Sequence, residues 1–144
     1  GNLLIAFKDG QLWTHDSTVY NNFFGIQYES TITPIFNEGR GVKTFMAIEE
    51  ESNTIWDIPE IETSINSYGT TPQQSNLVSN DFKDIEGRYC AAFLRDSNSI
   101  GGINAGDSLK GDWIKLKLRN QNSDKLVSLN TLSMRLIDSP LNNR

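Results

Sequence analysis

Oxygen-bearing side chains gather between residues 96 and 111 in a pattern that could bind a hard cation. Asp96, Asn98 and Asp107 alternate with small residues and glycine, and carboxylate and amide oxygens around a glycine turn are the ligands that Ca²⁺ prefers. Two features oppose a calcium site: Ile100 stands where a ligand is needed, and Asp107 is short for a bidentate final ligand. Side chains of this kind also cap their own backbone in ordinary loops. We therefore expect no cofactor, and these three residues remain the candidates for a metal.

Ser108 is the candidate nucleophile. Residues 106–109 read Gly-Asp-Ser-Leu, the signature of the GDSL esterases, whose serine needs a histidine base within hydrogen-bond reach. In that family the motif closes an apolar first strand, and the histidine follows it near the C-terminus. Here a glycine- and asparagine-rich loop precedes the motif, and the sole histidine, His15, comes before it. We expect Ser108 to lie in a polar loop with no imidazole nearby.

Other carboxylates offer a weaker route to catalysis. Glu60 and Glu62 would share one face of a strand and could act as a glycosidase pair, but solvent-exposed acidic residues are common in an acidic domain. Residues 49–51 are three consecutive glutamates, which we interpret as charges at a strand end that discourage edge-to-edge association. The sequence thus predicts a protein that is not an enzyme. A hydrolase is kept as the third interpretation, behind two non-enzymatic ones.

Three tryptophans raise the alternative of a carbohydrate-binding module, because sugar rings stack on exposed aromatic side chains. Trp113 shares a strand face with three cationic residues and is expected to be exposed, whereas Trp13 and Trp56 are expected in the core or an interface. Cys90 is expected to be a small buried residue rather than a reactive thiol. The predicted contact surface of the domain consists of Trp113, Asp96, Asn98 and Asn104.

Composition and charge limit the class of protein. The 144 residues fit one domain, and a net charge of −5 with a pI of 4.8 opposes binding of nucleic acid through its phosphates. The longest apolar run, residues 3–7, is far shorter than a membrane span and follows no charged leader, so neither a span nor a signal peptide is expected. Asn, Ser and Thr supply 39 residues, which favours strands and turns over helices.

The elements that must position these residues are strands. Residues 113–119 alternate strictly, which predicts that Ile114, Leu116 and Leu118 face a core while Lys115 and Lys117 face solvent. Residues 3–7 and 11–15 flank an Asp-Gly pair and predict a hairpin. Further strands are expected at 30–36, 43–49, 58–65, 77–85, 88–94 and about 127–137, the last with a bulge near residues 130–131; loops are expected at 37–41, 67–75 and 96–111. This pattern predicts an all-β fold, an antiparallel two-sheet β-sandwich of the jelly-roll kind with little or no helix.

Two segments give the chain a family resemblance. Residues 7–15 (Phe-Lys-Asp-Gly-Gln-Leu-Trp-Thr-His) and 22–28 (Asn-Phe-Phe-Gly-Ile-Gln-Tyr) resemble stretches of the tail or muzzle proteins of crAss-like bacteriophages of gut Bacteroidetes. Residues 86–89, 95–96 and 106–111 continue the likeness in the same order along most of the chain.

The resemblance implies a non-enzymatic structural domain of a phage tail protein, near the C-terminus of a larger virion protein. Its expected partners are other tail or virion proteins in a symmetric oligomer, with a host-surface glycan or receptor as a further partner. Its expected work is tail assembly or host-surface contact, in a virion made in the bacterial host cytoplasm. The family offers no catalytic residues to carry over.

Overall fold

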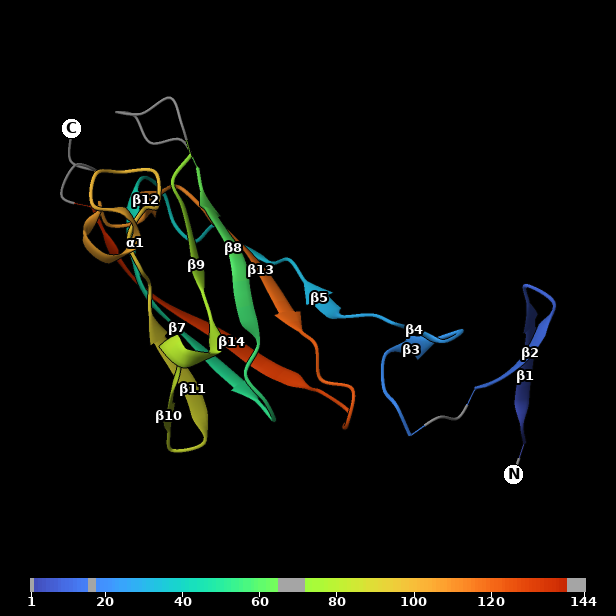
Figure 1. The fold of residues 1–144 in the computed structure, drawn as a ribbon. Coiled ribbons are helices and arrows are strands. Elements are labelled where there is room, and N and C mark those ends of the chain that lie inside the picture. Colours follow the sequence, from blue (N-terminus) through green and yellow to red (C-terminus); the bar gives the residue numbers. More distant parts are fainter. Residues whose placement is uncertain (1, 16–17, 65–71, 140–144) are drawn as a thin grey trace.

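The computed structural model describes residues 2–15, 18–64 and 72–139. Two five-stranded antiparallel sheets face each other, and two short hairpins precede them in the chain (Figure 1). Strands make up 52% of the structure and helix 5%. The prediction of an all-β, two-sheet antiparallel sandwich with little helix is therefore confirmed, while the jelly-roll order of connections stays a prediction.

The first sheet, called the β7 sheet, is organised around its longest strands. It contains β7 (Lys43–Ser52), β10 (Lys83–Ile85), β11 (Arg88–Ala92), β12 (Lys110–Gly111) and β14 (Leu129–Asp138). One edge of β7 pairs with β14, and its other edge pairs with β11 and β12, which lie end to end. The register of β14 shifts between Leu129 and Thr131, which confirms the bulge expected near that point.

The second sheet, called the β13 sheet, has the same plan. It contains β5 (Ser30–Ile32), β6 (Ile35–Phe36), β8 (Asp57–Thr63), β9 (Gln74–Leu77) and β13 (Ile114–Asn120). One edge of β13 pairs with β8, and its other edge pairs with β5 and β6. The single strand expected at 30–36 is two strands, because Pro34 lacks an N–H and its carbonyl instead accepts a hydrogen bond from the Leu116 N–H.

Several predicted boundaries are wrong: β7 continues to Ser52, past the expected end at 49, β11 ends at Ala92 instead of 94, and β12 lies within the loop expected at 96–111. The loop expected at 67–75 ends earlier, because β9 begins at Gln74; residues 65–71 lie outside the described residues. The strand expected at 77–85 is interrupted by the short 3-10 helix η1 (Ser79–Asp81), where the Asp81 carboxylate accepts a hydrogen bond from the Val78 N–H and fixes the turn. The 96–111 loop likewise contains the four-residue helix α1 (Gly102–Ala105).

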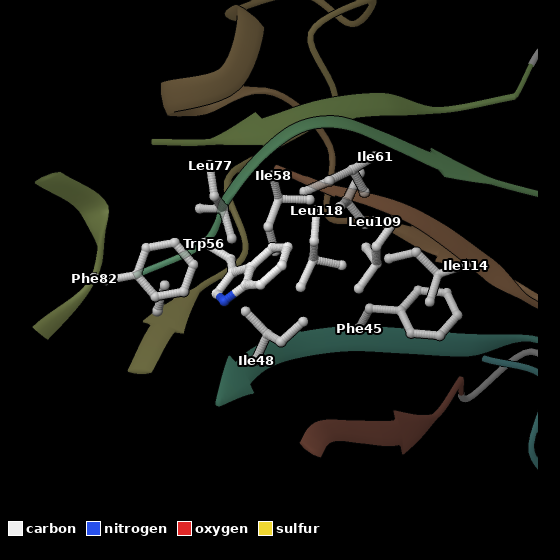
Figure 2. Close-up of a cluster of buried hydrophobic side chains, with 12 residues drawn as sticks. Phe45, Ile48, Trp56, Ile58, Ile61, Leu77, Phe82, Leu109, Ile114 and Leu118 are labelled. Carbon is white, nitrogen blue, oxygen red and sulfur yellow. The ribbon is translucent and has the colours of Figure 1, made fainter. Parts of the chain in front are cut away.

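The core lies between the sheets and is supplied by their facing sides (Figure 2). Ile114, Leu116 and Leu118 are fully buried, as their alternation predicts, while the side chains of Lys115 and Lys117 remain more than a third exposed. The buried cluster consists of Phe45, Ile48, Trp56, Ile58, Ile61, Leu77, Phe82, Ala91, Leu109, Ile114, Leu116 and Leu118. The prediction that Trp56 is a core residue is confirmed.

An N-terminal arm, defined here as residues 2–15 and 18–28, precedes the sandwich. It holds β1 (Leu4–Lys8), β2 (Gln11–His15), β3 (Asn22–Phe23) and β4 (Ile26–Gln27). The β1–β2 hairpin is the one the sequence predicts, and Asp9 and Gly10 in its turn both have positive φ (52° and 73°). This hairpin lies beyond β3–β4 and away from both sheets (Figure 1).

Candidate functional site

Asp96 holds the 96–111 loop to the sandwich. Its side chain is buried, with a residue exposure of 8%, and its Oδ1 accepts hydrogen bonds from the backbone N–H groups of Gln74 (3.1 Å) and Asn98 (3.0 Å). The Asp96 N–H donates to the Asp107 carbonyl at 2.9 Å. The carboxylate is thus engaged by backbone donors, which is the arrangement of a loop clasp.

The remaining residues of the predicted contact surface are more accessible than Asp96. Asn98 and Asn104 are exposed, and Trp113 is half-buried with its carbonyl accepting the Ser64 N–H at 3.0 Å. Asp107 is exposed and donates its N–H to Ser99 Oγ. A contact role for Asn98, Asn104 and Trp113 therefore stays a prediction, whereas the burial of Asp96 gives that residue a structural role.

Ser108 and His15 lie in different parts of the molecule. Ser108 Oγ accepts a hydrogen bond from the Arg95 guanidinium, and its carbonyl accepts one from Gln73 Nε2 at 3.1 Å. The His15 ring packs edge-on against Phe24 in the arm, with ring centroids 6.0 Å apart. No hydrogen bond joins the two residues in the described chain, so Ser108 has no imidazole positioned to activate it.

Glu60 and Glu62 are paired with cations rather than with each other. Cross-strand register places Glu62 beside Lys115 (Oε1–Nζ 3.2 Å) and Glu60 beside Lys117 (Oε1–Nζ 3.0 Å). These pairs lie on the outer face of the β13 sheet, opposite the side that faces the core. Each of the two carboxylates is thus engaged by its own lysine, whereas a glycosidase pair works with its two carboxyl groups facing the scissile bond.

The same outer face contains a groove of about 620 Å³. Its polar lining includes both Lys–Glu pairs together with the amide side chains of Gln74 and Asn76 on β9, and no aromatic residue lines it. Amides and paired charges can exchange hydrogen bonds with a neutral polar ligand, but the groove has no flat aromatic surface on which a sugar ring would stack.

The three consecutive glutamates of β7 divide between two environments, which the sequence analysis missed. Glu49 and Glu51 face outward and contact Arg88, at 2.7 Å and 3.9 Å. Glu50 points into the sandwich and is fully buried. The alternation of a strand is the signal that could have separated Glu50 from its two neighbours.

Glu50 is the one strongly perturbed carboxylate among the described residues. Its Oε2 accepts the Trp56 N–H at 3.0 Å, while its Oε1 and the Trp56 Nε1 are buried without a hydrogen-bond partner in the described structure. Burial raises the pKa of Glu50 to about 7, the Trp56 hydrogen bond opposes this rise, and Asp57 adds to it. Because this carboxylate is buried between the two sheets, its charge bears on folding.

Cys90 is half-buried, and the prediction of a fully buried thiol is wrong. The opposite sheet covers one face of β11, where Ala91 points, while Cys90 lies on the other face with its Sγ 3.6 Å from Glu49 Oε2. Partial burial and then the contact with Glu49 raise the pKa of the thiol. The raised pKa keeps Cys90 in the protonated thiol form, which is a weaker nucleophile than the thiolate.

Exposed apolar side chains are concentrated at the beginning of the chain. Of 18 large hydrophobic residues that are exposed in the described structure, 12 lie between residues 3 and 35. These 12, called here the N-terminal apolar strip, are Leu3, Leu4, Ile5, Phe7, Leu12, Val19, Tyr20, Phe23, Ile26, Tyr28, Ile32 and Ile35. Exposed apolar surface concentrated in this way marks an interaction site more often than scattered single residues do.

An aromatic cluster joins the two hairpins of the arm. The ring of Trp13 packs edge-on against Phe24, with centroids 5.9 Å apart, and Lys8 Nζ lies 4.6 Å from the Phe24 centroid. Gly25 has positive φ (78°), and a Cβ there would lie 3.0 Å from the Trp13 ring. The tight approach therefore requires glycine, and it fixes the orientation of the β1–β2 hairpin on β3–β4.

Two other kinds of site are absent from the described ranges. No group of three or more His, Cys, Asp or Glu side chains is arranged to hold a metal ion there. No helix in that part of the chain is long and apolar enough to cross a membrane.

Comparison with protein families identifies the relatives of this fold. Residues 18–96 match the family described as the Crassvirus muzzle protein C-terminal domain. The chain belongs to this family. Membership supports a structural role in a phage virion, a location in the virion and association with other phage proteins, and it argues for a domain without enzymatic activity. A comparison with curated proteins found no match.

The family match covers part of the sandwich and half of the arm. It includes β3 to β11, and therefore the resembling residues 22–28, 86–89 and 95–96. The β1–β2 hairpin precedes it, and β12, β13 and β14 follow it. Because β13 is central to one sheet and β14 borders β7 in the other, both sheets need residues beyond the matched segment.

Proposed function

We propose that this chain is a non-enzymatic structural domain of a phage muzzle protein, which acts in tail assembly or in contact with the host surface. The observation that carries the proposal is the family match over residues 18–96. The candidate nucleophile and carboxylate pair add support, because Ser108 contacts Arg95 and both glutamates are paired with lysines. We also propose that residues 1–144 form one domain of a larger protein made in the host cytoplasm.

The position of the domain in the particle tests this function. A short epitope tag placed after Gly87, in the exposed β10–β11 turn, would be introduced into the encoding phage, and purified virions would be labelled with an antibody fragment for electron microscopy. Label at the tail is the expected result. Finding the chain in infected cells but not in purified virions would overturn the proposal.

A carbohydrate-binding role is the second candidate; the amide and charged side chains of the polar groove on the outer face of the β13 sheet support it because they can exchange hydrogen bonds with sugar hydroxyls, and such binding would proceed without aromatic stacking. Lys117 and Gln74 lie in that groove and are free of core contacts, so the pair of changes Gln74→Ala and Lys117→Ala should leave the fold intact. Glycan-array binding that these changes abolish would support this role. Binding that is absent, or that they leave unchanged, would remove it.

A further inference from the structure

The N-terminal apolar strip is unlike the rest of the molecular surface. It holds two thirds of the exposed large hydrophobic residues in the described structure, yet no residue before Phe36 belongs to the core cluster or packs against it. Phe7, which lies near the turn end of the β1–β2 hairpin, is 77% exposed. A two-stranded hairpin with no third strand and with one face left uncovered is marginal in water, so these residues need cover that the sandwich does not supply.

The register of the hairpin separates a covered face from an open one. Trp13, opposite Ala6, lies on the face that packs against Phe24. Phe7 is paired with Leu12 on the opposite face, and both are more than half exposed. The open face therefore consists of apolar side chains that point away from the arm's own aromatic cluster.

The arm's attachments hold this face away from its own sandwich. The Tyr20 N–H donates to the Ser123 carbonyl at 2.9 Å, and Asn21 Nδ2 donates to Ser30 Oγ at 2.8 Å, which fix β3–β4 to the body. Trp13 in turn fixes β1–β2 onto Gly25. Folding back to cover the open face would break these contacts, so the described residues do not themselves supply the cover.

We infer that the N-terminal arm binds a second copy of this chain. The ten side chains of the strip that belong to the arm, each exposing about 100 Å², present roughly 1,000 Å² of apolar surface, and a stable interface needs ~800 Å² per partner. Burial of most of this surface against a second copy would meet that requirement. The inference deepens the proposed function, on which it rests for its biological setting, because it names the surface and the partner through which copies would assemble.

The chain also carries a surface suited to receive the arm. β14 is ten residues long and pairs with β7, and no described strand pairs with its other edge. The β1–β2 hairpin likewise has open outer edges. Pairing of the hairpin of one copy with β14 of the next would satisfy backbone groups on both sides, and such head-to-tail contacts generate rings or filaments.

Sedimentation velocity over a concentration series tests the inference with Phe7→Asp as the central variant. The wild-type chain should form a discrete oligomer, and Phe7→Asp should raise the dissociation constant at least about 10-fold, because it places a charge in the buried centre of the contact. Ile85→Asp is the matched control, since Ile85 is an exposed apolar strand residue of β10, far from the arm. It should associate like the wild type.

A chain without residues 1–15 keeps the inference falsifiable if the substitution perturbs the hairpin. No core residue is removed, so this chain should keep its far-UV circular dichroism and melting temperature while remaining monomeric. A wild-type chain that stays monomeric, that forms a broad range of aggregates, or that associates equally well without the arm would overturn the inference. That result is separable from the virion-labelling experiment, which tests the structural role whichever surface mediates assembly.

Discussion

The β1–β2 hairpin and strand β13 are both rich in apolar residues and have opposite fates. β13 places its apolar residues at alternate positions, β1 is apolar over four successive residues, and both pair with an antiparallel neighbour. Leu116 of β13 is fully buried, whereas Leu12 of β2 is more than half exposed. The difference is that β7 and β14 provide a facing sheet for β13, while no described element covers the face of the hairpin on which Leu12 lies. The residue pattern of a strand thus indicates that the strand pairs with a neighbour, whereas its burial depends on whether another element of the fold covers it.

The largest expected effect compares the same substitution in the two regions. Leu116→Ala should lower the free energy of unfolding by ~2–5 kcal/mol, because it leaves a cavity in the core. Leu12→Ala should lower it by less than ~0.5 kcal/mol, because the side chain is already in water. Urea denaturation, at concentrations where the chain is monomeric, measures both. Equal losses would show that the arm and the sandwich form one cooperative core.

The second prediction concerns Glu50, which the arm does not contact. Its pKa is raised from 4.5 to about 7 in the folded state, so the folded chain binds more protons than the unfolded chain between these values. The stabilisation is therefore complete below pH 4.5 and is lost as pH rises through about 7. Glu50→Gln should match the wild type at low pH and be more stable at pH 8 by up to about 3 kcal/mol.

The control for Glu50→Gln is Glu49→Gln, which removes a charge from the outer face of the same strand. A difference between low pH and pH 8 as large as that of Glu50→Gln would show that the effect does not depend on the buried position of Glu50. A chain without residues 1–15 should keep the wild-type pH dependence of the free energy of unfolding, since Glu50 lies within the sandwich. Should Glu50→Gln titrate like the wild type, the buried carboxylate is not the group that sets this slope.

The third prediction is of intermediate size and concerns the 96–111 loop. Asp96→Ala should lower the free energy of unfolding by ~1–3 kcal/mol, because the N–H groups of Gln74 and Asn98 lose their acceptor. Asn98→Ala leaves the backbone bond in place and should cost less than ~0.5 kcal/mol. Thermal unfolding of the two variants distinguishes a clasp from a freely solvated loop, for which both would behave alike.

Sequence alone predicts the parts of this fold that depend on local pattern. The hairpin turn at Asp9 and Gly10, the buried face of β13 and the bulge after Leu129 all follow from alternation and turn chemistry. Strand β9 was missed for a different reason. β9 has a polar sequence, Gln-Ser-Asn-Leu, and becomes a strand because β8 offers it an edge, which is a tertiary effect.

The candidate site was less predictable than the fold. Asp96 was singled out by residue type, but its role depends on Gln74, a residue 22 positions earlier in the chain. The polar groove combines residues of β8, β9 and β13, which no spacing rule brings together. The apolar strip could have been noticed as hydrophobic, but its exposure follows from the lack of a covering sheet, which a strand pattern does not encode.

The smallest expected effect on global stability is at Trp13, the residue that joins the two hairpins of the arm. Trp13→Ala removes the contacts with Phe24 and Gly25, and should change the free energy of unfolding by less than ~0.5 kcal/mol because no core residue is touched. Amide hydrogen exchange should nevertheless accelerate in β1 and β2, since a hairpin without its anchor opens locally. Trp13→Phe retains an aromatic ring and should exchange more slowly than Trp13→Ala. If Trp13→Ala instead lowered the midpoint of global unfolding as much as Leu116→Ala, the arm would be an integral part of the folded core, and the contrast between the two regions would fail.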